Sequence, residues 1–156
     1  MSDIAPSTPA VTPVPTHRLK QIANDACSLA LDKSDGYDHS RTEAWNSQII
    51  NHIIRALISE STPPASAGLP APQTPWKFAV NSTIIQHLSP KAAAASSSEG
   101  SELVNGKADN SAVSAGRRGM HSACGAFWNK EKDGMWSFKL DTKGMDVVIS
   151  VLWIAV

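Results

Sequence analysis

The stretch MDVVISVLWIAV, residues 145–156, constrains the fold most strongly because it is apolar on two sides. Successive side chains of a β-strand point to opposite faces of its sheet. One face of a strand over these residues would carry Val147, Ile149, Val151 and Trp153, and the other would carry Val148, Leu152, Ile154 and Val156. Both faces of this strand therefore need a cover that excludes water.

Two helices are predicted near the start of the chain. Apolar residues recur at helical spacing from Thr16 to about Leu31, which predicts one amphipathic helix. Ser40 followed three residues later by Glu43 is a capping-box pattern, and it predicts the start of the second helix. The pair at 63–64, Pro-Pro, prevents that helix from continuing.

Strands are predicted for most of the remaining apolar sequence. Alternating patterns predict strands over 76–88 and 136–141, and 119–128 is expected to form a weaker strand of small residues. NKEKDG, residues 129–134, is expected to form the turn before 136–141, with Gly134 free to adopt a positive φ. The expected fold class is α+β, with two N-terminal helices packed on a four-stranded antiparallel sheet.

This predicted fold leaves one face of the sheet uncovered. Two helices can cover one face of a four-stranded sheet, while the final strand is apolar on both faces. An apolar patch of that size is unusual on a monomer, and a second copy of the same sheet would bury it. We therefore expect a two-fold homodimer.

Three segments have compositions that do not favour folding. Residues 1–15 hold four prolines and are expected to form a disordered N-terminal tail before a domain over 16–156. Residues 61–75 form a Pro-rich connector, and 89–117 form a low-complexity insert of small and polar residues.

Charge and cysteine content exclude several classes of function. The chain has 14 Lys and Arg against 14 Asp and Glu, so the basic excess typical of nucleic-acid binders is missing. It has no apolar run of about 18 residues and no pattern typical of a secretory signal, so we expect no membrane insertion. Cys27 and Cys124 lie far apart without metal-type spacing, which favours a reduced, intracellular protein without metal or cofactor.

A catalytic cysteine is one interpretation of RRGMHSACGAFWNKEKDGMWSFKLD, residues 117–141. A cysteine nucleophile needs a base within hydrogen-bond reach and an environment that lowers its pKa. His121 and Cys124 are three residues apart, so on one strand they point to opposite faces and cannot pair unless a bulge intervenes. A small residue packed in a sheet is the simpler interpretation of Cys124.

A calcium loop is a second interpretation of this stretch. Asn129, Glu131, Asp133 and Gly134 match positions one, three, five and six of an EF-hand loop. Position twelve, which needs a bidentate acid, is Leu140, and strands rather than helices are predicted on both sides. A solvated hairpin turn explains the pattern better.

Peptide binding is the third interpretation. The segment 119–126, GMHSACGA, has few large side chains, so as a strand it would contribute mainly its backbone. Extended peptides join sheet edges through backbone pairing. A central strand whose small residues allow close packing is the structural alternative.

Several motifs together resemble the Tctex-type dynein light chain family. Tyr37, His39 and Ser40 match its Tyr-x-His-Ser pattern, and Trp45 matches the tryptophan of its second helix. The first strand begins in the same way, with Trp76, Lys77 and Phe78, and the family's most specific motif is matched by His121, Ala123, Ala126, Phe127 and Trp128. The family's cysteine position holds Gly125 or Ala126 here, so that cysteine is not carried over to Cys124. The resemblance covers about 17–60, 76–88 and 118–156.

The resemblance implies a non-catalytic subunit of the cytoplasmic dynein motor, associated with microtubules through that motor. It implies a homodimer in which the strand over 119–128 crosses to the partner's sheet, and an intermediate-chain segment that adds as a strand beside it. The implied partner-binding residues are Gly119, Met120, His121, Ser122, Ala123, Cys124, Gly125, Ala126 and Phe127. The expected dimer interface comprises Phe127, Trp128, Val147, Ile149, Val151 and Trp153. Cargo proteins are a further class of partner for such an adaptor.

The chain departs from the family pattern in two linkers. About 29 low-complexity residues separate the first two predicted strands, where family members have a short loop, and the connector at 61–75 is longer and richer in proline. A long linker leaves the strand exchange unstrained, because loop entropy grows slowly with length, but it also makes an unswapped arrangement sterically possible. A small hydrolase that uses Cys124, and a general peptide-binding hub unrelated to motors, remain the alternative functions.

Overall fold

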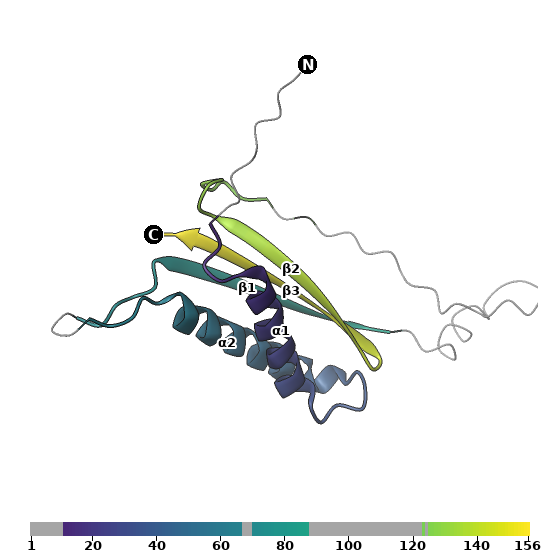
Figure 1. The fold of residues 1–156 in the computed structure, drawn as a ribbon. Coiled ribbons are helices and arrows are strands. Elements are labelled where there is room, and N and C mark those ends of the chain that lie inside the picture. The colour runs from purple at the N-terminus through teal and green to yellow at the C-terminus, as the bar shows by residue number, and fades with distance from the viewer. Residues whose placement is uncertain (1–10, 67–69, 88–122, 124) are drawn as a thin grey trace, which may run out of the picture.

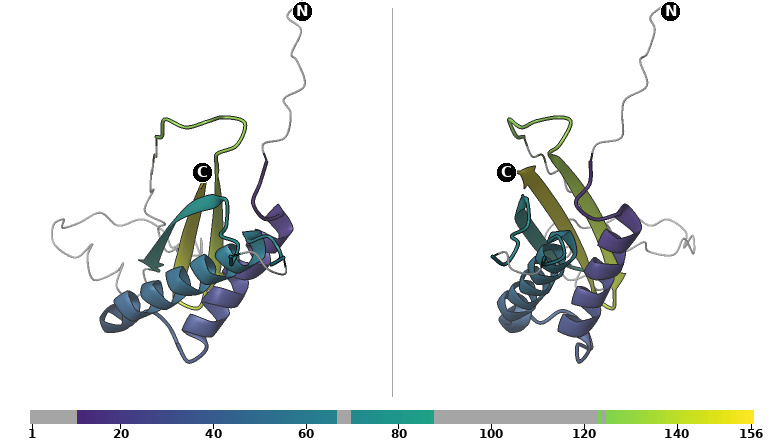
Figure 2. Two further views of the ribbon diagram at one scale, coloured as in Figure 1. Left: turned by 90° about the vertical axis from the view of Figure 1, so that its left-hand side faces the viewer. Right: turned by 60° about the vertical axis from the view of Figure 1, so that its left-hand side comes forward.

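A computed structural model of the chain describes residues 11–66, 70–87, 123 and 125–156. These residues form a helical layer packed on one face of an antiparallel sheet (Figures 1 and 2). The elements are α1 (Thr16–Leu31), the short 3-10 helix η1 (His39–Arg41), α2 (Thr42–Ser61), β1 (Trp76–Gln86), β2 (Gly134–Thr142) and β3 (Met145–Ala155). The predicted α+β class, with two helices and an antiparallel sheet, is confirmed, with three strands in the described part of the chain.

The two helices bury the faces that their periodicity predicts. On α1 the buried residues are Leu19, Ile22, Ala23, Ala26, Cys27 and Ala30, and on α2 they are Trp45, Ile49, Ile53 and Leu57. Among the described residues, no helix is both long and apolar enough to cross a bilayer.

The predicted capping box at the start of the second helix is wrong. Ser40 lies inside η1, and α2 begins two residues later at Thr42 with no side-chain cap. Asp38 caps η1 instead, because its carboxylate accepts hydrogen bonds from the backbone N–H of Ser40 at 2.9 Å and from its hydroxyl at 2.6 Å. The side-chain cap is therefore Asp38, four residues before Thr42, and it marks the start of the helical segment formed by η1 and α2.

The last strand of the sequence is the central strand of the sheet. The strand order is β1-β3-β2, and both pairings are antiparallel. In this register Val151 lies between Val80 of β1 and Trp136 of β2. The tight turn between β2 and β3 contains Gly144 at φ +79°, a conformation that favours glycine.

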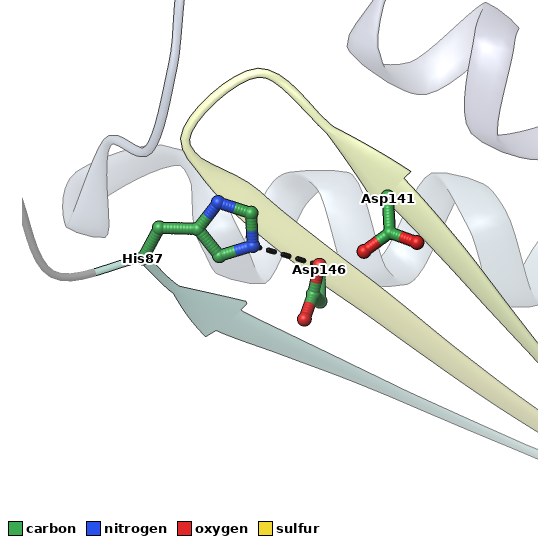
Figure 3. Close-up of side chains that lie close together, drawn as sticks. All are labelled: His87, Asp141 and Asp146. Carbon is green, nitrogen blue, oxygen red and sulfur yellow. Dashed lines mark hydrogen bonds and ion pairs between the residues drawn. The ribbon is translucent and has the colours of Figure 1, made fainter. Parts of the chain in front are cut away.

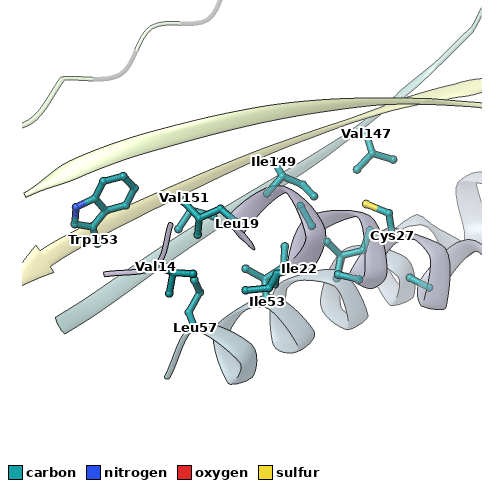
Figure 4. Close-up of a cluster of buried hydrophobic side chains, with 14 residues drawn as sticks. Val14, Leu19, Ile22, Cys27, Ile53, Leu57, Val147, Ile149, Val151 and Trp153 are labelled. Atoms are coloured by element: carbon teal, nitrogen blue, oxygen red, sulfur yellow. The ribbon is translucent and has the colours of Figure 1, made fainter. Parts of the chain in front are cut away.

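The inner face of the sheet and the helices share one core (Figure 4). Val147, Ile149, Val151 and Trp153 project from β3 toward the helices, and each is at most 4% exposed. From β1, Trp76, Phe78, Val80 and Ile84 pack against the same cluster. This face of the final strand is therefore covered within a single chain.

Residues 11–15 are ordered against the domain, although composition assigned them to the disordered tail. Val14 is 1% exposed and belongs to the core cluster. The backbone N–H of Val11 donates to the carbonyl oxygen of Glu131 at 3.3 Å. One buried valine and one backbone bond thus hold this segment beside the loop that precedes β2, while residues 1–10 lie outside the described part.

Gly134 does not have the role expected from the turn pattern. It is the first residue of β2, and its φ is not positive. A Cβ at this position would lie 2.5 Å from Cζ2 of Trp153 and 2.7 Å from Cε2. Glycine is needed here because the indole of Trp153 packs directly on the backbone.

Candidate partner-binding surface

The structure describes only part of the predicted peptide-binding segment. Gly119, Met120, His121, Ser122 and Cys124 lie outside the described residues, and so does the whole predicted insert over 89–117. Ala123, Gly125, Ala126 and Phe127 are exposed, and Trp128 is half-buried. Residues 125–129 belong to no strand, so the described end of the predicted strand over 119–128 does not pair with the sheet of its own chain.

Four residues of the predicted dimer interface lie elsewhere than expected. Val147, Ile149, Val151 and Trp153 face the helices and are buried in the core of one chain. This placement does not fit a dimer contact, because their surfaces are already covered. Phe127 and Trp128 remain accessible for such a contact.

The outer edge of β2 is the first candidate surface. In the described part of the chain, the ladder pairs β2 only with β3, so the opposite edge of its nine residues has no strand partner. An unpaired edge presents a row of backbone N–H and C=O groups that another strand can bind. The edge has no proline to block such pairing.

The outer face of the sheet is the second candidate surface, and its polarity changes along the strands from apolar at one end to polar in the middle. At the end near the C-terminus of β3, Met135, Leu152 and Ala79 form one cross-strand row, with Ile154 beside them. Met135 and Ile154 are each 44% exposed. In the middle, the hydroxyls of Ser137 and Ser150 lie 3.0 Å apart in a hydrogen bond. The apolar patch therefore occupies one end of this face, not the whole face.

Charged side chains gather at the opposite end of the outer face (Figure 3). Nε2 of His87 lies 2.7 Å from Oδ1 of Asp146, and Nζ of Lys139 lies 2.7 Å from Asp141 and 3.1 Å from Asp146. Burial raises the pKa of Asp146, but hydrogen bonds from His87 and its other neighbours outweigh burial and lower that pKa to about 2.

This charged group contains residue types that bind cations, but ion pairs among its own side chains explain why they lie together. The ligand atoms of His87, Asp141 and Asp146 all lie within 4.8 Å of one another. The ammonium group of Lys139 already forms ion pairs with both carboxylates. The group is an exposed ion-pair network that fastens the end of β1 to β2 and β3.

Asp133 is a buried polar residue, although its sequence pattern predicts a solvated turn. It is 7% exposed, and its two carboxylate oxygens accept hydrogen bonds from the backbone N–H groups of Asn129 and Ala155, each at 2.8 Å. The sequence signal was present in Asn129 and Asp133, since both side chains commonly close turns through backbone N–H groups. The link to Ala155 depends on tertiary structure and has no local signal.

Cys27 is the cysteine that the structure describes, and it is poorly suited to nucleophilic chemistry. It is fully buried in the core, and burial raises the pKa of its thiol to about 11. A thiolate is the reactive form, so this environment keeps the group inert. Cys124 and His121, the pair of the catalytic interpretation, lie outside the described residues.

The Tyr-x-His-Ser motif forms the entry to α2. The Tyr37 hydroxyl and Nδ1 of His39 are 3.0 Å apart, and Asp38 caps η1 through Ser40. The guanidinium of Arg41 lies 4.9 Å from the ring centroid of Trp45, which is buried at the start of the helix. These residues set the position of α2 and do not form a binding cleft.

Comparison with known proteins places this fold in a family. The model of the Tctex-1 family matches residues 13–154. The chain belongs to the Tctex-1 family. A relative from Schizosaccharomyces pombe, named "Dynein light chain Tctex-type", is 28% identical over 144 residues, which cover 92% of this chain and 97% of the relative. A relative of the same name from Drosophila melanogaster is 22% identical over 122 residues, which cover 78% of this chain and 74% of the relative.

Family membership agrees with the resemblance seen in the sequence. The match begins at residue 13, next to the buried Val14, and ends at residue 154, within the central strand. It therefore covers both helices, β1, β2 and all but the last residue of β3.

Proposed function

We propose that this protein is a non-catalytic light chain of cytoplasmic dynein that acts as a homodimer and binds the dynein intermediate chain by β-strand addition. The motor places it on microtubules in the cytoplasm, and cargo proteins are a second class of partner. The observation that carries the proposal is the outer edge of β2, which pairs with no described strand, beside a segment, 125–128, that belongs to no strand.

The proposed assembly uses both candidate surfaces. The strand over 119–127 of one copy adds to the outer edge of β2 in the other copy, and the intermediate-chain segment adds to the remaining edge of that strand. The apolar row of Met135, Leu152 and Ala79 lies on the outer face next to this edge, where a second copy would bury it. Phe127 is fully exposed in the single chain, and a partner chain would cover its ring.

Two peptide sites on one dimer make the binding bivalent. Each site can be weak, because after the first contact the second becomes intramolecular and the effective concentration is high. Such a dimer would hold two intermediate chains side by side. This use requires backbone pairing at each edge and no reactive side chain.

The first test is the mass of the purified chain by sedimentation equilibrium. We expect about twice the chain mass of 16.6 kDa at micromolar concentration. A monomer at that concentration would contradict the proposed dimer.

The second test separates backbone pairing from thiol chemistry in the predicted strand. Ser122→Pro removes a backbone N–H and fixes φ, so it should abolish binding of an intermediate-chain peptide. Cys124→Ser preserves the backbone and should bind within a few-fold of wild type in a calorimetric titration. Loss of binding in Cys124→Ser with full binding in Ser122→Pro would favour a thiol-dependent protein instead.

A further inference from the structure

Threonine followed by proline occurs three times in the described part of the chain, at Thr12, Thr62 and Thr74. Proline-directed protein kinases transfer phosphate to a serine or threonine that precedes proline, and they bind that residue in an extended chain. Proline favours this conformation, because it moves the preceding residue out of the helical region. The dipeptide itself is the same at the three positions, so the surroundings of each hydroxyl decide which threonine a kinase can reach in the folded protein.

Thr62 is held at the end of a helix. It is the C-terminal cap of α2, and its backbone N–H donates to the carbonyl oxygen of Ile58 at 3.0 Å. Its hydroxyl donates to the same carbonyl oxygen. Residues 59–61, which precede it, are helical. A kinase would have to break both bonds and unwind the last turn of α2 before it could bind this site in an extended chain.

Thr74 is held beside the sheet. Its hydroxyl lies 2.6 Å from that of Ser61 in a partly buried hydrogen bond. The next residue, Pro75, accepts the backbone N–H of Val156 at 3.0 Å, and β1 begins at Trp76. Binding of this site by a kinase would therefore require the first residues of β1 to leave the sheet.

Thr12 is the least constrained of the three threonines. It is exposed, its hydroxyl forms no hydrogen bond with another described residue, and residues 11–15 form no helix or strand. This segment is held by the buried side chain of Val14 and by the bond from the N–H of Val11 to the carbonyl oxygen of Glu131, at 3.3 Å. Such bonds usually measure about 2.7–3.2 Å, so this one is weak. The segment can therefore open locally while the helices and the sheet stay folded.

We propose that Thr12 is a phosphorylation site for a proline-directed protein kinase that uses ATP. In the transfer, Oγ1 of Thr12 forms a bond to the γ-phosphorus of ATP, and the bond from that phosphorus to the bridging oxygen of the β-phosphate breaks. ADP leaves, and the hydroxyl proton passes to the kinase. The modified residue carries a charge of about −1.5 to −2 at pH 7, next to the residue that bonds to Glu131. The modification requires neither the homodimer nor the peptide site proposed above.

The first test measures the rate of phosphorylation at each threonine in the folded chain. Thr8 and Ser89 also precede proline but lie outside the described residues, so every chain carries Thr8→Ala and Ser89→Ala. The chain is incubated with a mitogen-activated protein kinase, Mg²⁺ and ATP, and the modified residues are identified by mass spectrometry. Each rate is divided by the rate for a synthetic peptide that contains the same threonine, over 10–18, 58–66 or 70–78. This ratio removes the preference of the kinase for particular neighbouring residues.

We expect the ratio of folded-chain rate to peptide rate to be at least tenfold higher for Thr12 than for Thr62 or Thr74. In Thr12→Val the signal at this position should be lost. Equal ratios at the three threonines overturn the inference, as does a folded chain without phosphate on Thr12. A peptide over 10–18 that the kinase does not modify overturns it as well.

The second test shows whether local opening exposes Thr12. Val14→Ala shortens the side chain that anchors the segment in the core, whereas Val11→Ala makes the same change at a side chain that is 58% exposed. The Thr12 ratio should rise roughly threefold or more in Val14→Ala and stay at the wild-type value in Val11→Ala, with matching substitutions in the peptides. Equal increases at Thr12, Thr62 and Thr74 would show that the kinase acts on globally unfolded chains, and this outcome overturns the inference.

Discussion

Replacement of Gly134 by alanine tests the close packing between the start of β2 and the end of β3. The new methyl carbon would lie 2.5 Å from Cζ2 and 2.7 Å from Cε2 of Trp153. Carbon atoms pack best at about 3.5–4.0 Å, so the indole or the strand must move by roughly 1 Å. Trp153 is 4% exposed and lies in the core cluster with Val14, which limits how far its ring can move.

The expected loss of stability follows from two opposing effects. Overpacking of a core contact costs about 1–3 kcal/mol. Alanine in place of glycine in a strand gains about 0.5–1 kcal/mol, because the unfolded chain has less freedom to lose. We expect a net loss of about 1.5 kcal/mol in the free energy of unfolding, or roughly 6–12 °C in Tm for about a hundred ordered residues.

Gly125→Ala is the matched control for this substitution. Gly125 is exposed, and a Cβ there would meet nothing within 4 Å. Urea denaturation of both variants at one fixed protein concentration removes any effect of self-association on the comparison. The reasoning would be refuted if Gly134→Ala were as stable as Gly125→Ala.

A double-mutant cycle identifies the ring atoms responsible. Trp153→Phe removes the indole atoms Cζ2, Cε2 and Nε1, which are the three atoms that would lie nearest to a Cβ on residue 134. Gly134→Ala should therefore cost at least about 1 kcal/mol less in the Trp153→Phe background than in wild type. Simple additivity of the two costs would show that the clash lies elsewhere.

Three further experiments test the core, the charged group and the outer face. Ile53→Ala should lower the free energy of unfolding by about 2–5 kcal/mol in urea denaturation, whereas Ile58→Ala on the exposed side of the same helix should cost far less. Folding lowers the pKa of Asp146 from 3.8 to about 2, so the stability that its carboxylate contributes is present above pH 4 and is lost as the pH falls toward 2. In Asp146→Asn, the fall in Tm that comes from protonation of this carboxylate should be missing from thermal scans between pH 4 and pH 2. Leu152→Lys on the outer face should weaken the dimer in sedimentation equilibrium without unfolding the chain, whereas Val151→Lys should unfold it, because a buried unpaired charge costs several kcal/mol.

Periodicity predicted the elements well because each of them is buried on one side. The helical spacing in α1 and α2 and the alternation in β1 correspond to faces that pack on one core. The final strand was predicted as an element, but its two faces could not be told apart, because Val147 and Val148 have equal apolar character. The register with β1 places Val147 opposite Ile84 and turns that side toward the helices. This pairing is a tertiary property that the strand itself does not encode.

The candidate site was harder to predict because its deciding contacts join distant residues. Asp-Gly at 133–134 has the composition of a hairpin turn, whereas Asp133 bonds to Ala155 and Gly134 packs on Trp153. The burial of Val14 was not predicted, because a single apolar side chain has little weight in the average composition of a proline-rich segment. The motifs that indicated the family did not depend on these contacts.

The central place of β3 has a consequence for how the protein is made. β3 lies between β1 and β2, yet it follows all the other described elements in sequence. During synthesis both helices and both outer strands leave the ribosome before the strand that joins them, so their apolar faces stay open until residues 145–155 emerge. A nascent chain halted before Met145 would hold two helices and two strands without a common core, and would be a natural client for chaperones.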